Sequence, residues 1–386
     1  MDFGKTEEQE LLLESLREVF ARHNDYEDYF KQCDKEHKYP VEACKDMVDA
    51  GFAKLGIPEE LGGVEADGIT QLMVAEEAFA HGWPLATWVN YSLQVDNMLT
   101  FGNQEQQEKI MKLAMQGIKP YTLGLTEPQA GSDSNAATTR ADKKDGKVII
   151  NGQKTFNTGA NIAPYMLCLA RNYKNEKPAK DMSMYFVPYD TPGITKNPID
   201  KIGMTYVQTF EVFFDNVEVD ESALVGTEGN GFMNLMKNFE HERLNGCVSM
   251  LGYARCAYHD AVKYAGQRVQ FGQTIGSFQL IQEKLTDMAI KIENMRNIIY
   301  HTAWKKEKGL SIQIDSALAK RYCARSSFEV CDDAMQILGG IGYVHDSRVS
   351  RLWRDVRINR VMAGSDEIMV HIAGRALIKE AEKTAR

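Results

Sequence analysis

The spacing of apolar residues changes twice along this chain of 386 residues, and the order of the changes limits the folds it can adopt. From residue 6 to about residue 117, apolar residues recur at helical spacing, as in Leu11, Leu12 and Leu16. Between about 121 and 226 the period becomes two, and β-branched and aromatic residues dominate. From residue 232 the helical period returns and holds almost to the end. Helices, then strands, then helices argue against a doubly wound sheet and favour an α+β fold.

The same changes of period predict three domains. We expect an N-terminal α-helical domain over residues 1–120, a central antiparallel β-barrel domain over residues 121–228 and a C-terminal α-helical bundle domain over residues 229–386. Within the central domain, Asn151-Gly152 stands between the strand-like runs 148–150 and 154–156. Because an Asn-Gly pair tolerates the positive φ angles of a type I′ turn, we expect a two-residue hairpin turn there.

The composition argues against several classes of protein. The formal charge is −9 and no block of Lys or Arg occurs, which argues against a nucleic-acid binder. No stretch is apolar over the roughly 18 residues that a membrane span needs, and the first residues lack an apolar signal region, so we expect a cytoplasmic protein. The seven cysteines are scattered without a Cys-x-x-Cys pair, so we interpret them as reduced packing residues and expect no metal site.

A loop rich in hydroxyls and backbone donors is expected where the first helical block meets the first strand. Residues 126–133 read Thr-Glu-Pro-Gln-Ala-Gly-Ser-Asp. Such a loop can hold polar atoms of a ligand, although Gly-Ser-Asp by itself is also typical of an ordinary turn. Later in the chain, residues 339–342 read Gly-Gly-Ile-Gly after a helical stretch, which argues against a dinucleotide fingerprint and predicts a helix C-cap. Glycines there would also let a phosphate approach the backbone.

These motifs together resemble those of the acyl-CoA dehydrogenase family. Residues 126–133 are similar to the family's first signature, Thr-Glu-Pro-Gly-Ala-Gly-Ser-Asp, with Gln129 in place of a Gly. The resemblance continues through the runs 154–158, 268–272, 336–342 and 354–355. It implies a C-terminal four-helix bundle and an FAD-dependent enzyme that acts on the Cα–Cβ bond of a CoA thioester. It also implies a homotetramer, a dimer of dimers, and an electron-transferring flavoprotein as partner.

By this resemblance, two groups of residues bind FAD and one residue binds CoA. Thr126 and Thr158 would hydrogen-bond the isoalloxazine edge, and Phe156, where most members have Trp, would cover one face of the flavin. Ser132 would reach the pantetheine or phosphate part of CoA. The second FAD group would grip the pyrophosphate and adenosine end, partly across a subunit interface: Arg268, Phe271, Gln336, Gly339, Gly340, Ser365 and Glu367, the last in place of a common Gln.

The catalytic base must be a carboxylate held near the α-carbon of the thioester. Many family members use a Glu in a Glu-Gly-Thr motif, but here that position holds Ala363. A second subset, which includes the isovaleryl and long-chain enzymes, carries the base on an earlier helix immediately before an Arg, and Glu242-Arg243 matches that place. Asp366 and Glu367 are rival acids, yet after a Ser they are typical of the first turn of a helix.

Helical phase supports Glu242 independently of the family. The apolar residues before it share one face of the expected helix: Phe232, Leu235, Met236 and Phe239. Glu242 lies three residues beyond Phe239 and continues that stripe, so we expect its carboxylate to point inward. Burial would raise the pKa of Glu242, and neighbouring Arg243 would oppose that rise. The alternative is an exposed Glu on a polar stretch of the helix.

The acyl group is expected to lie between the helix of Glu242 and residues 83–98. Trp88 and Tyr91 are three residues apart on one predicted helical face, with Asp96 further along, and Phe239 would line the same pocket. Aromatic faces and a carboxylate suit a quaternary ammonium group, at about 1 to 2 kcal/mol for a desolvated contact. The alternative is core packing for Trp88 and a solvated carboxylate for Asp96.

Across its whole length the chain resembles the crotonobetainyl-CoA reductases of bacterial carnitine metabolism, on runs such as 57–63, 351–355 and 364–367. This resemblance implies interconversion of crotonobetainyl-CoA and γ-butyrobetainyl-CoA, with hydride transfer between substrate Cβ and flavin N5 and proton exchange at Cα by Glu242. Two alternatives stay open. The substrate could be another short-chain or aryl enoyl-CoA, of the butyryl or cinnamoyl type. The second alternative is that the protein is a non-catalytic scaffold, because Ala363 stands where many family members have the catalytic carboxylate.

Overall fold

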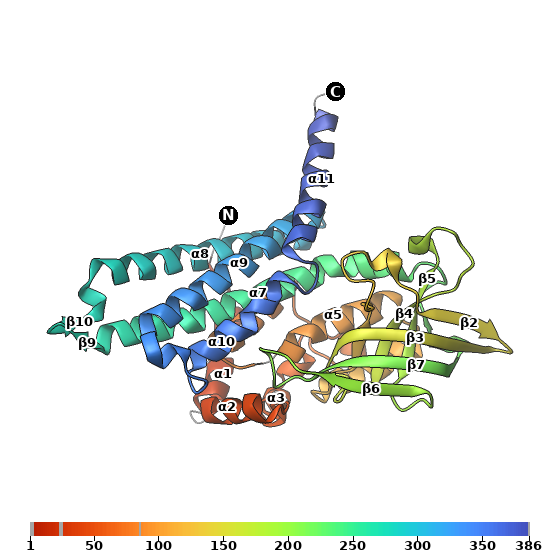
Figure 1. Cartoon of the computed structure of the whole chain (residues 1–386), viewed down its shortest axis with the longest axis horizontal. Helices are drawn as coiled ribbons and strands as arrows, with labels where there is room; N and C mark the ends of the chain where they lie inside the picture. The colour runs from red at the N-terminus through yellow and green to blue at the C-terminus, as the bar shows by residue number, and fades with distance from the viewer. Residues whose placement is uncertain (1–3, 23–25, 85, 385–386) are drawn as a thin grey trace.

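The fold is a long helical body that carries a β domain at one end (Figure 1). The computed structural model describes residues 4–22, 26–84 and 86–384, and the side chains of residues 86–93 and 384 lie outside that description. Within this part of the chain, no helix combines the length and the apolar character needed to cross a membrane.

The first third of the chain is helical, as its periodicity predicts. Side chains set where three of its helices begin: Thr6 and Gln9 form a capping box at the first, Asp67 caps the fourth, and Asn103 forms a box with Gln106 at the sixth. The helices are α1 (Glu7–Ala21), α2 (Tyr26–Glu36), α3 (Val41–Asp49), α4 (Gly68–Ala80), α5 (Ala86–Phe101) and α6 (Gln104–Met115).

The middle third forms one main sheet. Its strands are β1 (Tyr121–Gly124), β2 (Arg140–Lys144), β3 (Lys147–Thr158), β4 (Tyr165–Arg171), β5 (Met182–Pro188), β6 (Ile194–Ile199), β7 (Thr209–Asp220) and β8 (Leu224–Val225). The order is β6-β7-β3-β2-β4-β5-β8, with β1 on β4. Most pairs are antiparallel, whereas β1 and β2 each pair with β4 in parallel. Because the order ends at β6 and β8, the hydrogen-bonded ladder of the described residues is open and does not close into the expected barrel.

The predicted hairpin turn at Asn151-Gly152 is wrong. Both residues lie inside β3, where the register against β7 shifts between Ile150 and Gly152. The turn that joins β2 to β3 is Asp145-Gly146, whose φ angles are 52° and 77°. Asp-Gly satisfies a type I′ turn as well as Asn-Gly does, so the sequence offered two candidate turns six residues apart. Asn151-Gly152 instead continues β3 opposite a bulge in β7, where Asp215 and Asn216 together stand opposite Asn151.

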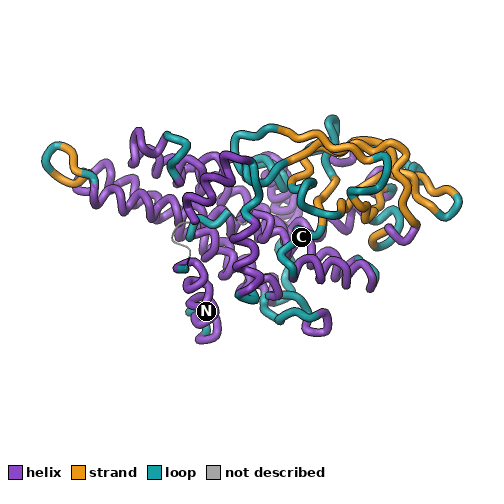
Figure 2. The backbone as a smooth tube through the Cα atoms, turned by 90° about the horizontal axis from the view of Figure 1, so that it is seen from below, coloured by secondary structure: helices purple, strands orange, loops and turns teal. Residues whose placement is uncertain are grey.

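The last third is again helical. Helix α7 (Gly231–Gln267) ends at a two-stranded hairpin, β9 (Val269–Gln270) and β10 (Gln273–Thr274). It is followed by α8 (Gln279–Glu307), α9 (Gln313–Leu338), α10 (Arg348–Arg357) and α11 (Asp366–Thr384). Helix α7 packs against α4, α5, α8 and α9, and therefore joins the two helical parts. Both views place the β9–β10 hairpin at the opposite end of the molecule from the main sheet (Figures 1 and 2). The predicted α+β fold class is confirmed.

All seven cysteines are buried and free, in agreement with their interpretation as packing residues. Burial raises the pKa of the Cys44 and Cys168 thiols to about 11 and that of Cys256 to about 12. These thiols stay protonated at neutral pH, and as small apolar groups they fill the core.

The contact between α4 and α7 leaves no room for a side chain at Gly252. A Cβ atom there would stand 2.4 Å from Phe79 Cβ and 2.8 Å from the backbone oxygen of Glu76. Gly266 lies on the same helix, and a Cβ there would meet nothing within 4 Å. The two glycines form a matched pair for testing how tightly α7 is packed.

We expect G252A to destabilise the protein by about 1–3 kcal/mol, because the two helices would have to separate. G266A should instead be neutral or stabilise the protein by up to about 1 kcal/mol, since Ala favours the helix. Urea unfolding followed by circular dichroism checks both values. Equal effects of the two substitutions would contradict this packing.

Candidate active site

Glu242 lies on α7, on the face that contacts α5 and the β domain. Leu235 is buried in the core shared with the β domain, and Phe232, Met236 and Phe239 pack against that core. The apolar stripe therefore faces inward, and Glu242 continues it. The Oε2 atom of Glu242 is shut off from solvent and has no hydrogen-bond partner among the described residues. The side chain as a whole is half-buried, and this oxygen lies inside the protein.

The surroundings of Glu242 hold its pKa near neutrality. Burial raises the pKa to about 7, and the positive charges of Arg243, Lys119 and Lys320 oppose that rise. Burial in turn lowers the pKa of Arg243, while Glu242 supports its charged form. A carboxyl group with this pKa can take up and return a proton at physiological pH.

Several buried polar atoms on α5 and α7 also lack hydrogen-bond partners among the described residues. They are Gln94 Oε1 and Asn97 Oδ1 on α5, and His241 Nδ1 and Arg243 Nε on α7. Buried polar atoms are hydrogen-bonded in most proteins, so a cluster of unpaired ones indicates a place where water or a ligand binds. The α5–α7 contact therefore has the polar lining of a ligand site.

Tyr121 on β1 forms hydrogen bonds with two residues of α5, Gln94 and Asn97. Its hydroxyl donates to the backbone oxygen of Gln94 at 3.2 Å and accepts from Asn97 Nδ2 at 3.3 Å. Asp96 lies on the same helix, with its Oδ2 3.5 Å from His241 Nδ1. Trp88 and Tyr91 are also on α5, but their side chains lie outside the described residues. The predicted aromatic group around Asp96 therefore stays a prediction.

The 126–133 loop is held by a buried ion pair that the sequence did not single out. Glu127 Oε1 lies 2.7 Å from Lys154 Nζ, with side-chain exposures of 1% and 0%. The Glu127 carboxylate also accepts from the backbone N–H groups of Thr138 at 2.7 Å and Thr139 at 3.0 Å. Burial raises the pKa of Glu127, but Lys154 and these hydrogen bonds outweigh it and lower the pKa to about 2. Lys154 stands in the middle of a predicted strand, and this position was the feature of the sequence that could have indicated a buried ion pair.

Gln129, which stands where the family has Gly, is accommodated in this loop. Its Nε2 donates to Glu127 Oε2 at 2.8 Å and to Thr138 Oγ1 at 2.8 Å. The predicted CoA residue Ser132 is exposed on the same loop.

Phe156 is an aromatic residue that the strand turns outward. The register between β3 and β7 shifts between Lys154 and Asn157, and Phe156 has a φ of 57° with 63% of its surface exposed. Bulges of this kind re-aim a side chain at the cost of local strain. The backbone oxygen of Thr126 accepts from Thr155 N at 2.9 Å, and Thr158 Oγ1 lies 3.0 Å from Thr209 Oγ1. An exposed ring two residues before a threonine hydroxyl on the same strand fits the face and edge of a planar heterocycle such as the isoalloxazine of FAD.

The second group of predicted FAD residues lies apart from the first. Arg268 and Phe271 stand at the β9–β10 hairpin, and Phe271 is 94% exposed with a φ of 52°. Gln336, Gly339 and Gly340 are exposed at the end of α9, where Gly339 is the C-cap with a φ of 64°. Since the hairpin lies at the opposite end from the β domain, a single chain does not bring Phe271 and Phe156 together (Figure 2).

The segment before α11 contains Ala363 in place of a carboxylate. Ala363 has a φ of 54°, and Lys320 Nζ donates to the backbone oxygen of Gly364. Ser365 Oγ accepts from Ile368 N at 3.4 Å, as expected for a residue before a helix.

The two rival acids near α11 do not lie free in the interior. Asp366 is buried but paired with Arg360 at 2.9 Å and Arg325 at 3.3 Å. Glu367 is exposed. Asp366 Oδ1 is also buried without a hydrogen-bond partner, but two arginines hold the other oxygen of this carboxylate, whereas no ion pair within 4 Å holds Glu242 among the described residues.

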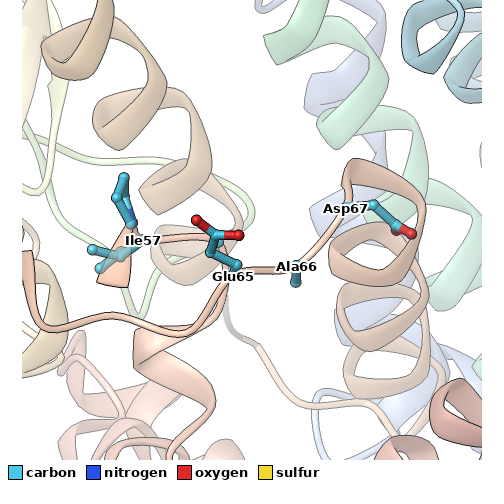
Figure 3. A pocket seen from close by; sticks show the side chains of 6 residues that line it. Ile57, Glu65, Ala66 and Asp67 are labelled. Atoms are coloured by element: carbon cyan, nitrogen blue, oxygen red, sulfur yellow. The ribbon is translucent and has the colours of Figure 1, made fainter. Parts of the chain in front are cut away.

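A surface hollow elsewhere does not belong to this site. It has a volume of about 420 Å³ and lies beside the start of α4 (Figure 3). Its walls are Gly56, Ile57, Pro58, Glu65, Ala66 and Asp67. None of them is a predicted site residue, and the Glu65 and Asp67 carboxylates would repel the phosphates of CoA.

The fold is that of a flavin-dependent oxidoreductase that acts on CH–CH bonds. The chain belongs to the acyl-CoA dehydrogenase family: residues 6–117, 122–217 and 229–378 match the family's N-terminal, middle and C-terminal domains. Its cofactor is FAD.

Relatives match over nearly the whole length. "Probable acyl-CoA dehydrogenase YdiO" from Escherichia coli is 49% identical over 381 residues, covering 98% of this chain and 99% of that protein. The structure of butyryl-CoA dehydrogenase from Megasphaera elsdenii is 30% identical with a TM-score of 0.90, covering 98% and 100% of the two chains. A structure described under the electron transferring flavoprotein of Acidaminococcus fermentans is 32% identical with a TM-score of 0.90, covering 98% and 99%.

We expect K154M to destabilise the protein by about 3–5 kcal/mol, because it leaves the Glu127 carboxylate buried and unpaired. K147M is the control. Lys147 lies on the same strand as Lys154 and pairs with Asp220 of β7 at 2.7 Å, but both side chains are exposed. Loss of this exposed pair should cost less than about 1 kcal/mol. Urea unfolding at pH 7 measures both.

The difference between K154M and wild type should shrink as the pH falls. The pKa of Glu127 is lowered in the folded state, so its contribution is complete above the unfolded value of about 4.3 and is lost as the pH falls toward about 2. A difference that stays constant down to pH 2 would contradict the assignment.

Proposed function

We propose that Glu242 is the residue that exchanges the α-proton of an acyl-CoA or enoyl-CoA substrate. The observation that carries this proposal is its Oε2 atom, which is shielded from solvent without a hydrogen-bond partner, together with a pKa raised to about 7, on a helix that packs against α5 and β5. In dehydrogenation the ionised carboxylate takes the proton from Cα, and in enoyl reduction the protonated form returns it. Arg243 stabilises the ionised form.

FAD, when bound, supplies the two-electron chemistry by exchanging a hydride between its N5 atom and the substrate Cβ. Thr126 and Thr158 would hold the isoalloxazine edge, with Phe156 against one face, and Ser132 would bind the pantetheine or phosphate part of CoA. The exposed Phe156 ring and the hydroxyls beside it support this placement.

A second copy of the chain would complete the FAD site. The pyrophosphate and adenosine end would be held by the second group: Arg268, Phe271, Gln336, Gly339, Gly340, Ser365 and Glu367. The separation of the β9–β10 hairpin from the β domain within one chain, together with the 94% exposure of Phe271, supports a dimer of dimers in which each hairpin reaches a neighbour. We expect the three domains to meet near residues 120 and 228 in each copy.

For the acyl group we propose crotonobetainyl-CoA and γ-butyrobetainyl-CoA, as in carnitine metabolism. The α5–α7 contact offers electron-rich groups: the Asp96 carboxylate and the unpaired oxygens of Gln94 and Asn97. These oxygens carry negative charge or partial negative charge and attract a cation, which suits a trimethylammonium tail packed against Phe239.

The structural likeness to butyryl-CoA dehydrogenase favours a second candidate, an uncharged short-chain acyl group. A non-catalytic scaffold, which Ala363 suggested, is less well supported because Glu242 provides a buried carboxylate. We propose an electron-transferring flavoprotein as the redox partner, supported by the similar Acidaminococcus fermentans structure. A cytoplasmic location stays a prediction.

We expect E242Q to keep the flavin absorbance and lose about 10²- to 10⁴-fold in α-proton exchange with deuterated water, because Gln cannot take up the proton. E240Q, on the same helix and half-buried, should behave like wild type. Unchanged exchange in E242Q would exclude Glu242 as the base, and a colourless wild-type protein that takes up no FAD would favour the scaffold.

We expect D96N to lower kcat/KM for crotonobetainyl-CoA by about 5- to 30-fold, the equivalent of a 1–2 kcal/mol cation contact. The same substitution should leave kcat/KM for crotonyl-CoA, which has no charge on its tail, unchanged. A panel of CoA esters followed by flavin reoxidation provides both values. An equal loss on the two substrates would show that Asp96 does not select a cationic tail.

A further inference from the structure

Asp355 is a buried carboxylate on α10 that forms a hydrogen bond with another domain. Only 1% of its surface is exposed, although Asp is almost never fully buried without a partner. Among the described residues, its Oδ1 accepts from the backbone N–H of Met204, and its Oδ2 has no hydrogen-bond partner. Met204 lies in the connection between β6 and β7, so this bond joins the C-terminal domain to the middle domain.

This bond is kept under two unfavourable conditions. Burial raises the pKa of Asp355 to about 6, and the positive charge of Arg351 opposes that rise. Met204 has a φ of 48°, a backbone conformation that costs free energy in a residue other than Gly. Strained backbone persists where the surrounding contacts demand one geometry, and it is concentrated at functional sites. We therefore looked for what the connection between β6 and β7 holds in place.

Two further contacts hold this connection against the helical body. Thr205 Oγ1 donates to the backbone oxygen of Asp34 on α2 at 2.8 Å, and the Asp34 carboxylate pairs with Arg354 on α10 at 2.7 Å. A Cβ atom on Gly203 would stand 2.5 Å from the backbone oxygen of Arg354, so the connection and α10 touch along their backbones. Residues 203–205 are thus fastened to both α2 and α10.

The connection is also braced from within, as far as the start of β7. Lys201 Nζ donates to the backbone oxygens of Met204 at 3.0 Å and Val207 at 2.6 Å. Tyr206 and Val207 are each 1% exposed and pack in one cluster with Cys33 of α2. A displacement of Met204 would therefore reach the start of β7 and would not be absorbed by a flexible loop.

The start of β7 lies against the strand end that carries Thr158. The backbone oxygen of Gln208 accepts from Gly159 N at 2.7 Å. Thr209 is the register partner of Thr158, and their hydroxyl oxygens are 3.0 Å apart. A Cβ atom on Gly159 would stand 2.8 Å from Lys119 Cδ, so the chain is closely packed here as well. Hydrogen bonds and buried backbone therefore lead without a break from Asp355 to Thr158.

We propose that Asp355 is a positioning residue for the flavin: by holding the N–H of Met204, it fixes the connection between β6 and β7 and thereby the place of Thr158 at the isoalloxazine edge. This inference rests on the proposed contact between Thr158 and FAD. No bond is made or broken at Asp355, which acts through the backbone. The helical body would in this way set the geometry of the flavin site in the β domain.

The test compares D355A, which removes the acceptor of the Met204 N–H, with D355N, which keeps an oxygen there. D260A is the matched control. Asp260 on α7 bonds Arg348 at the first turn of α10, and it makes no hydrogen bond with residues 200–208 in the described part of the chain. D260A therefore loosens α10 without touching the connection between β6 and β7.

The first readout is the rate of substrate-driven flavin reduction in a single turnover, expressed per bound FAD. We expect this rate to fall by about 10- to 100-fold in D355A, because a small misplacement of a positioning group costs up to that much. The visible absorption bands of the bound flavin should shift in D355A as well. D355N and D260A should keep the wild-type rate and bands.

The second readout is independent of activity. Amide hydrogen exchange, measured by mass spectrometry on peptides that cover residues 201–209, should be faster in D355A than in wild type and unchanged in D260A. Unchanged exchange in D355A would show that Asp355 does not fix this connection and would overturn the proposal.

A purely structural role would also be visible. It would lower the free energy of unfolding and the FAD content of D355A but leave the rate per bound FAD and the flavin bands unchanged, and this result would overturn the proposal. If D355A does not fold, G203A takes its place, because the added Cβ pushes the connection away from α10 while Asp355 stays intact. G203A must then show the same loss of rate, with G266A as its control.

T158V separates this inference from the proposed function, since it removes the hydroxyl that is proposed to bond the flavin. If T158V changes neither the flavin bands nor the reduction rate, the proposed placement of FAD fails, and the role of Asp355 fails with it. If T158V changes both and D355A changes neither, only the role of Asp355 fails.

Discussion

The interaction on which this site depends is the one between a buried carboxylate and the cations around it. Burial alone would keep Glu242 protonated, and strong pairing would keep it ionised. Here three positive charges oppose desolvation without forming a hydrogen bond to Oε2, and the result is a pKa of about 7. The three charges come from different parts of the chain: Arg243 from α7, Lys320 from α9 and Lys119 from the connection into β1.

Two rigid connections keep that arrangement in place. Helix α7 is continuous over 37 residues, and its contact with α4 is so close that only Gly fits at residue 252. On the other side, the Glu127–Lys154 pair holds the 126–133 loop against β3 from inside the β domain. The helix that carries Glu242 and the 126–133 loop are therefore both held in position by buried contacts.

The sequence predicts what depends on periodicity, and misses what depends on long-range contact. The helix–strand–helix order and the inward phase of Glu242 follow from apolar spacing within a few turns. The Asn151-Gly152 turn was wrong because Asp145-Gly146 has the same local preference, and only pairing with β7 decides between them. Lys119 and Gly159 are forty positions apart, so nothing local shows that one makes room for the other. The outward turn of Phe156 likewise arises from a register shift against β7.

The seven buried cysteines have a practical consequence. Their thiols stay protonated because burial raises the pKa of several of them to between about 11 and 12, so they are poor nucleophiles and are shielded from oxidants. Alkylating reagents will then label this enzyme only when a segment opens. Since the cysteines are distributed from α2 to α9, the order in which they are labelled would map which parts of the molecule open first.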